Sequence, residues 1–185
     1  MDPRRHAGLS LGLSAVLDSL RAKRAEAEIG RVRASELHRL TEAMASAGGF
    51  SAMALAAAGF LREATGRPCA LHATHGARLS AYAAPEGEAF DERAAAWAID
   101  NGRPLGPGTL NWPELTVWCA PFARARSIGA AQVKLAPDQA PSGAEYDHWS
   151  ASVRQAGLAL ERERASDAAA RAEQRTSRSR APSCC

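Results

Sequence analysis

The sequence contains no long hydrophobic run, and this absence argues against a membrane-spanning helix. No stretch reaches the roughly 18–20 consecutive apolar residues that cross a bilayer. The run Leu9–Leu17 follows Arg4 and Arg5 and loosely resembles a signal peptide, but it is short, and Asp18 follows it without a clean small-residue cleavage site. We therefore expect a cytoplasmic chain with no membrane span.

Lysine is almost absent, and charge of either sign is nowhere strongly concentrated in the folded part. Lys23 and Lys134 are the only lysines among the 23 basic residues, and the formal net charge is +3. Arginines alternate with acidic residues, and no basic stripe carries interleaved aromatics, so we expect no nucleic-acid partner. Only the end, residues 171–180, is rich in arginine; it predicts a solvated tail, with contact to an acidic partner as the alternative.

Cysteine is sparse and lacks the spacing of a metal site. The four cysteines are Cys69, Cys119, Cys184 and Cys185. His72 and His75 follow Cys69 closely, but in a strand His72 would point away from Cys69 because side chains alternate between faces. We expect reduced thiols, no metal and no cofactor.

Apolar periodicity and turn residues predict a helix, helix, strand, strand, helix, loop, strand, strand, helix order. The predicted helices are 20–47, 51–65, 91–100 and 142–174, and the predicted strands are 69–73, 79–83, 116–122 and 128–135. Ser51 is the expected cap of the second helix, and Ser142 with Glu145 forms a capping box before the last. Neighbouring strands joined by tight turns indicate an antiparallel sheet, so the predicted class is α+β with helices on one face.

Two long helices flank this predicted core. We expect a weakly ordered segment 1–19, an N-terminal helix 20–47, a core 48–141, a C-terminal helix 142–174 and a disordered tail 175–185. A four-three-four apolar repeat in the C-terminal helix indicates a short coiled-coil-like seam, formed by Trp149, Val153, Ala156 and Leu160. Such a short seam needs the core or a partner helix, and we expect a homodimer formed through the two long helices.

Local sequence then narrows the interpretation to a family. The predicted order resembles that of a GAF domain. The segments 33–44 (RASELHRLTEAM), 97–110 (WAIDNGRPLGPGTL) and 158–162 (LALER) resemble the GAF-like region of KdpD-type osmosensitive potassium-channel sensor kinases. The resemblance covers about residues 20–175, and the helix-to-loop stretch 97–110 is its most specific part. Residues 110–113 (LNWP) depart from the family pattern.

The resemblance implies a non-catalytic sensory or regulatory module of a two-component potassium or osmosensing system. Its ligand is an unknown small molecule, and its partner would be a histidine kinase, because the phosphoacceptor segment, the ATP-binding domain and the membrane helices of the family do not occur in this sequence. A truncated, inactive fragment of a sensor kinase is an alternative.

The candidate ligand residues lie in the loop after the third helix and in the strand that follows. They are Gly106, Gly108, Thr109, Trp118 and Cys119. The backbone N–H groups of a Gly/Pro-rich loop suit an anion, but the loop lacks the lysine and spacing of a P-loop, and a structural turn is the competing interpretation. A thiol enzyme of the methionine sulfoxide reductase type, using Cys69 and Cys119, is the alternative function. We expect no enzyme activity.

Overall fold

The fold is described from a computed structural model that covers residues 4–75, 78–123, 127–136 and 139–180. The chain divides into two compact units, one extending to His38 and one beginning at Arg39. The first unit is a single helix, and the second contains the sheet and its covering helices. None of the described helices has both the length and the apolar character needed to cross a membrane.

Helix α1 runs from Arg4 to Ala45, so it begins well before the predicted start at Leu20. No proline follows Pro3 in this stretch, and helix-favouring Leu, Ala, Arg and Glu dominate it, so nothing in the backbone stops the helix earlier. The helix thus includes residues 4–19, for which the sequence pattern predicts a weakly ordered segment. Leu40 and Met44, near the end of α1, are buried in the core of the second unit.

Helix α2 spans Gly49–Thr65 and ends as the sequence predicts. Gly66 adopts the left-handed conformation and its N–H bonds to the Arg62 carbonyl, which terminates the helix. The start differs, because Gly48 is the N-cap and provides no side-chain hydrogen bond. Ser51 lies inside the first turn rather than at the cap.

The sheet contains four antiparallel strands in the order β2-β1-β4-β3. The strands are β1 Cys69–His75, β2 Arg78–Tyr82, β3 Val117–Pro121 and β4 Gly129–Lys134. Both predicted hairpins, β1–β2 and β3–β4, are present. The two hairpins join through β1 and β4, with Leu71 opposite Ala131.

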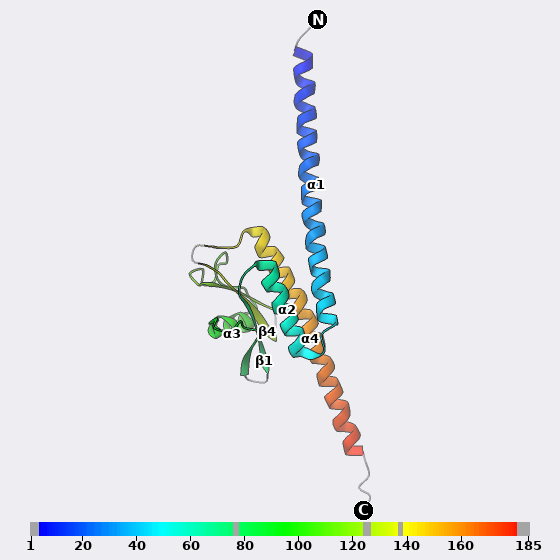
Figure 1. The fold of residues 1–185 in the computed structure, drawn as a ribbon, viewed down its shortest axis with the longest axis vertical. Helices are drawn as coiled ribbons and strands as arrows, with labels where there is room; N and C mark the ends of the chain where they lie inside the picture. The colour runs from blue at the N-terminus through cyan, green and yellow to red at the C-terminus, as the bar shows by residue number, and fades with distance from the viewer. Residues whose placement is uncertain (1–3, 76–77, 124–126, 137–138, 181–185) are drawn as a thin grey trace, which may run out of the picture. The chain divides into compact units, whose positions relative to one another are not determined.

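Helices cover both faces of this sheet (Figure 1). Helices α2 and α4, the latter spanning Gly143–Arg180, pack on one face, and α3, Glu92–Asn101, packs against β3 and β4 on the other. The sequence predicts helices on one face of the sheet, whereas in the structure α3 packs on the face opposite α2 and α4. The α+β class with an antiparallel sheet is confirmed.

The apolar seam of α4 is used inside the chain. Trp149, Val153, Ala156 and Leu160 are at most 2 % exposed and belong to the core shared with α2 and the sheet. The capping box is present, since Glu145 accepts from the backbone N–H of Ser142 and its own N–H donates to the Ser142 hydroxyl. The helix continues to Arg180, beyond the predicted end at 174, while residues 181–185 of the predicted tail lie outside the described part.

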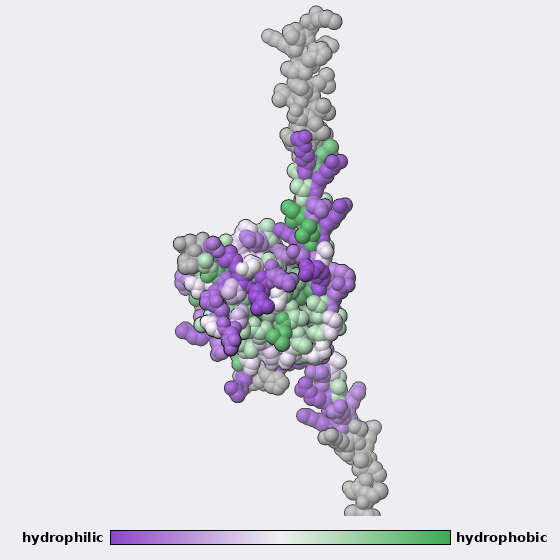
Figure 2. All heavy atoms as spheres, viewed as in Figure 1, coloured by the Kyte–Doolittle hydropathy of each residue, from purple (hydrophilic) through white to green (hydrophobic). Residues whose placement is uncertain are grey.

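The outer surface of the second unit is mixed in character (Figure 2). Alanine and glycine residues, including Ala52, Ala56 and Gly59 on α2, remain partly exposed beside Leu55, which is 58 % exposed. Figure 2 shows hydrophilic side chains alternating with weakly apolar ones on this side of the molecule.

Candidate functional site

The loop between α3 and β3 is closed by its own hydrogen bonds. The N–H of Gly106 donates to the Asn111 carbonyl, and the N–H of Thr109 donates to the Gly106 carbonyl. The Asn111 side chain bonds the Pro104 carbonyl, and its N–H bonds the Thr109 hydroxyl. Two of the amides proposed for an anion are thus occupied, and this geometry favours the structural turn.

The loop also lies directly on the edge strand β3. Leu105 and Cys119 exchange two backbone hydrogen bonds of 2.9 Å. Gly106 has a φ of 101°, and a Cβ there would collide with the Val117 carbonyl, so only glycine allows this approach. Gly108 lies farther out, on a surface hollow of about 440 Å³ that Leu115 and Thr116 also line.

Trp118 and Cys119 are adjacent in β3 and face opposite sides of the sheet. Trp118 is fully buried on the α4 side, where its ring meets Trp149 at 5.7 Å and Tyr146 at 5.9 Å between centroids. Cys119 is fully buried on the α3 side. The five predicted ligand residues therefore do not converge on one cavity, and their ligand role stays a prediction.

Three polar side chains gather under α3, and we call His72, Cys119 and Gln132 the α3-face polar cluster. Cys119 lies directly opposite Gln132 in the β3–β4 ladder, and Gln132 lies opposite Ala70 in the β4–β1 ladder. His72 is two residues from Ala70 and so faces the same side. His72 is 1 % exposed and Gln132 is fully buried.

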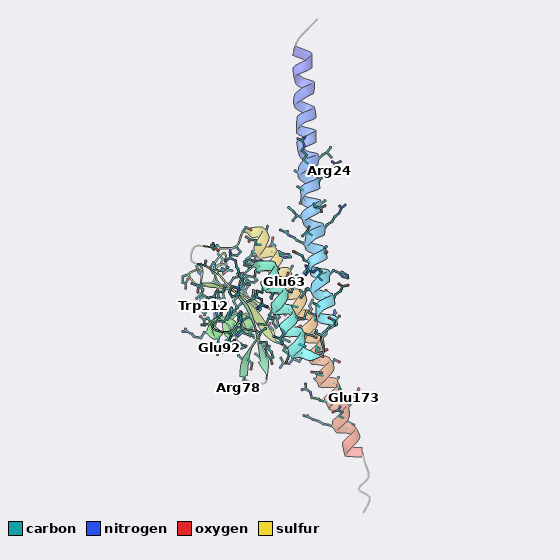
Figure 3. The ribbon with its side chains drawn as sticks, in the orientation of Figure 1. Arg24, Glu63, Arg78, Glu92, Trp112 and Glu173 are labelled. Carbon is teal, nitrogen blue, oxygen red and sulfur yellow. The ribbon has the colours of Figure 1, made fainter. Side chains whose placement is uncertain are left out.

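The start of α3 closes over this cluster. Gln132 donates from Nε2 to the Asp91 carbonyl at 2.6 Å, and Cys119 Sγ lies 3.8 Å from the Ala94 carbonyl. The Asp91 carboxylate caps the helix by accepting from the N–H groups of Arg93 and Ala94. Figure 3 shows Glu92 and Trp112 on this side of the sheet.

Several polar atoms of the cluster have no protein partner. Both ring nitrogens of His72 and Oε1 of Gln132 are buried without a hydrogen bond of normal geometry, although the Gln132 side chain lies near enough to His72 to raise its pKa. An unpaired buried donor or acceptor costs about 1–3 kcal/mol, so these atoms favour a polar guest or a rearrangement that satisfies them. Buried polar groups without a partner are few in native proteins, and each calls for an explanation such as a bound polar molecule, a water or a catalytic role.

The local electrostatics keep the cluster neutral. Burial lowers the pKa of His72, an effect that the charge of Glu92 and the Gln132 amide partly oppose. Burial also raises the pKa of the Cys119 thiol to about 12. The cluster therefore presents a neutral imidazole, an amide and an undissociated thiol.

The thiol alternative finds little support in this geometry. Cys69 belongs to the core on the α2 and α4 side, whereas Cys119 lies under α3, so the sheet separates the two sulfurs. Burial raises the pKa of Cys69 to about 11, and reactive cysteines need the opposite shift. Among the described residues, no group of three or more His, Cys, Asp and Glu side chains is placed to hold a metal ion.

Sequence reasoning did not identify Gln132 and weighed His72 only as a metal ligand. The one available signal was a glutamine inside the otherwise apolar run 128–133 (IGAAQV). A polar side chain in such a strand has to find a buried partner or function. That signal gives no indication that β1 and β4 are neighbours, and this pairing is what brings the two residues to one face.

Comparison with solved structures identifies the fold. The chain superposes on the GAF domain of the potassium sensor histidine kinase KdpD from Escherichia coli with a TM-score of 0.66 and 21 % identity, covering 74 % of this chain and 98 % of that one. It also matches the GAF domain of an Acinetobacter phosphoenolpyruvate-protein phosphotransferase, with a TM-score of 0.54 and 12 % identity over 72 % of this chain and 95 % of that one. No protein-family model and no curated protein matches the sequence.

The class of protein that the architecture defines is therefore a GAF fold. The sequence resembles the GAF-like region of KdpD-type kinases, and the structure matches the KdpD GAF domain. The resemblance is therefore confirmed at the level of the fold.

Proposed function

We propose that this chain is a non-catalytic sensory or regulatory module that binds a small polar molecule between the sheet and α3. The observation that carries the proposal is the α3-face polar cluster, with three buried polar atoms of His72 and Gln132 lacking partners. A neutral ligand that offers both hydrogen-bond donors and acceptors complements an imidazole and an amide oxygen. The predicted residue Cys119 belongs to the same site.

Strand β3 provides a route from this site to α4. Cys119 contacts the α3 side, and the next residue, Trp118, packs on Trp149 of α4. A ligand that moved α3 or the Cys119 backbone would thus alter the seating of Trp118 and the packing of α4. If α4 has two packing arrangements, a ligand shifts the equilibrium between them only as far as its affinities for the two arrangements differ.

The signalling context of the proposal comes from the KdpD likeness. We assign the module to a two-component system for potassium or osmotic stress, with a separate histidine kinase as partner and a cytoplasmic location. Homodimerisation through α1 and α4 would convert altered helix packing into an output. Two buried free cysteines suit a reducing compartment.

A thermal-shift panel tests the ligand site. Potassium ion, nucleotides, amino acids and small neutral metabolites are each added to the wild type, to Gln132→Leu and to Gln155→Leu, the last replacing an exposed glutamine of α4. We expect a ligand that raises the Tm of wild type and Gln155→Leu but not of Gln132→Leu. A ligand with equal effects on all three variants would place the binding site elsewhere.

The fluorescence of Trp118, which packs against Trp149, gives a second test of ligand binding. Binding under α3 is expected to change the emission of Trp118, which can be isolated by comparison with Trp118→Phe. A ligand that binds with unchanged emission in every variant would contradict the route through β3.

A further inference from the structure

A hollow lies at the ends of β1 and β2, beside α2 and α4, and none of the three residues of the α3-face polar cluster lines it. Its volume is about 380 Å³, within the range of small-molecule sites. The first turn of α2, the ends of β1 and β2, and the middle of α4 form its walls, and all belong to the second unit. We call it the Arg164 hollow; its lining includes Phe50, Ser51, Thr74, Tyr82, Arg164 and Arg171.

The charge inside the Arg164 hollow is unbalanced. Asp167 is the only acidic residue among the described lining residues, and it already pairs with Arg171 at 3.4 Å. Arg164 makes one long hydrogen bond, 3.5 Å, from Nη1 to the Thr74 hydroxyl, and no ion pair with a carboxylate is present for it in the described part of the chain. One half-buried guanidinium is therefore left with most of its donors unused.

The start of α2, which forms one wall of the hollow, adds no negative charge. The first turn of α2 contains no acidic residue, and its N-cap, Gly48, has no side chain. Ser51 lines the same hollow as Arg164. An anion placed here would therefore meet donors and no competing carboxylate other than the paired Asp167.

The remaining wall is aromatic. Phe50 and Tyr82 pack edge to face, with centroids 5.5 Å apart, and both line the hollow. A flat apolar group suits such a wall. The hollow thus offers a guanidinium at one part and an aromatic surface at another, which are the two features that recognise a ring bearing a phosphate group.

We propose that the Arg164 hollow binds a small organic phosphate, with Arg164 holding the phosphate and the ring lying against Phe50 and Tyr82. A phosphate compound bound in the hollow would connect α4 to the first turn of α2 and to the ends of β1 and β2. This contact would lie beyond Leu160, the last residue of the buried seam of α4. The bound phosphate would then stabilise α4 around residues 164–171. This site is independent of the ligand site proposed under α3.

Calorimetric titration with phenyl phosphate tests the proposal on the full chain. We expect binding to wild type that weakens about tenfold in Arg164→Gln, which is the scale of one lost charge-assisted contact. Arg162→Gln, an exposed arginine on the same helix, is the matched control and should bind within about twofold of wild type on the same scale. Equal affinity in Arg164→Gln and wild type would overturn the assignment.

Three further ligands separate the parts of the recognition. Inorganic phosphate lacks the ring, benzoate replaces the phosphate by a carboxylate, and benzyl alcohol is neutral. We expect phenyl phosphate to bind most tightly and benzyl alcohol to show no binding. If benzoate binds as tightly as phenyl phosphate, or if inorganic phosphate does, the proposed phosphate-and-ring chemistry is wrong.

A variant that fills the hollow distinguishes a lost binding site from a loss of folding. Ala168→Leu keeps both arginines and favours the helix, but it fills the hollow from α4. It should abolish phenyl phosphate binding while preserving the Tm of the free protein. Retained binding in Ala168→Leu would place the ligand outside the hollow.

Discussion

At the scale of single residues, burial decides the chemistry of this protein. His72, Cys69 and Cys119 are residue types that often react or titrate near neutral pH, yet each lies in the interior. Desolvation disfavours their charged forms. Two measurable consequences follow, one for the imidazole and one for the thiols.

The stability of the fold should depend on pH through His72. Its pKa is lowered from the ordinary 6.5, so below that value the unfolded chain binds a proton that the folded chain does not. The stabilisation is present above pH 6.5 and is lost as the pH falls, with a slope of at most about 1.4 kcal/mol per pH unit. Urea unfolding should show this slope between about pH 7.5 and about pH 5. This range extends about one to two units around an ordinary imidazole pKa.

The variant for this measurement is His72→Gln. It should flatten the pH profile of the unfolding free energy, because it removes the buried imidazole whose pKa burial lowers. Identical profiles for wild type and His72→Gln would show that His72 does not titrate differently on unfolding.

The buried thiols should be unreactive in the folded protein. In a Cys184→Ser, Cys185→Ser background, Ellman's reagent should label Cys69 and Cys119 only as fast as the protein opens, because burial raises both thiol pKa values, to about 11 and about 12. Fast stoichiometric labelling of either thiol without denaturant would revive the thiol-enzyme alternative.

At the scale of elements, close packing between α4 and the sheet restricts residue size. A Cβ on Gly157 of α4 would collide with the backbone and Cβ of Phe122, whereas a Cβ on Gly59 of α2 meets nothing within 4 Å. Gly157→Ala should therefore lose about 1–3 kcal/mol of unfolding free energy through overpacking. Gly59→Ala should gain about 0.5–1 kcal/mol from its helix propensity.

Denaturant unfolding of the two glycine variants checks this prediction directly. Both substitutions add the same methyl group inside a helix, so their difference reports the packing of α4 alone. A stabilised Gly157→Ala would mean that α4 can move away from Phe122 at no cost.

Local chemistry explains which elements could be predicted. The Ser142–Glu145 capping box and the Gly66 and Gly102 helix stops depend on neighbouring residues, and each is present as expected. Helix α1 begins before Leu20 and includes the apolar run Leu9–Leu17, which resembles a signal peptide in sequence and so does not by itself predict a helix continuous with residues 20–45. The α3-face polar cluster depends on the pairing of β1 with β4, strands far apart in the sequence, and no local signal specifies that contact.

At the scale of the whole molecule, the exposed apolar side chains of α1 suggest how copies associate. Ile29 and Val32 are 52 % and 51 % exposed. The two residues are three positions apart in the first unit, so they share one face of its helix. They form an exposed apolar stripe on the described part of this unit.

A second copy covering this stripe would give the proposed homodimer. The double variant Ile29→Glu, Val32→Glu should shift sedimentation from dimer toward monomer, while Leu110→Glu, at a 99 % exposed loop position, should not. A wild type that sediments strictly as a monomer at high concentration would contradict both the dimer and the helix-based output.

The Leu105–Cys119 bridge has a further consequence, for how the sheet meets other chains. Strand β3 is an edge strand, and edge strands invite unwanted strand addition. The outward N–H and C=O of Cys119 are already taken by Leu105, and the outward position of Pro121 has no N–H to offer. The glycine- and proline-rich loop thus protects this edge, and loosening it, for example with Asn111→Ala, is expected to make the protein prone to aggregate.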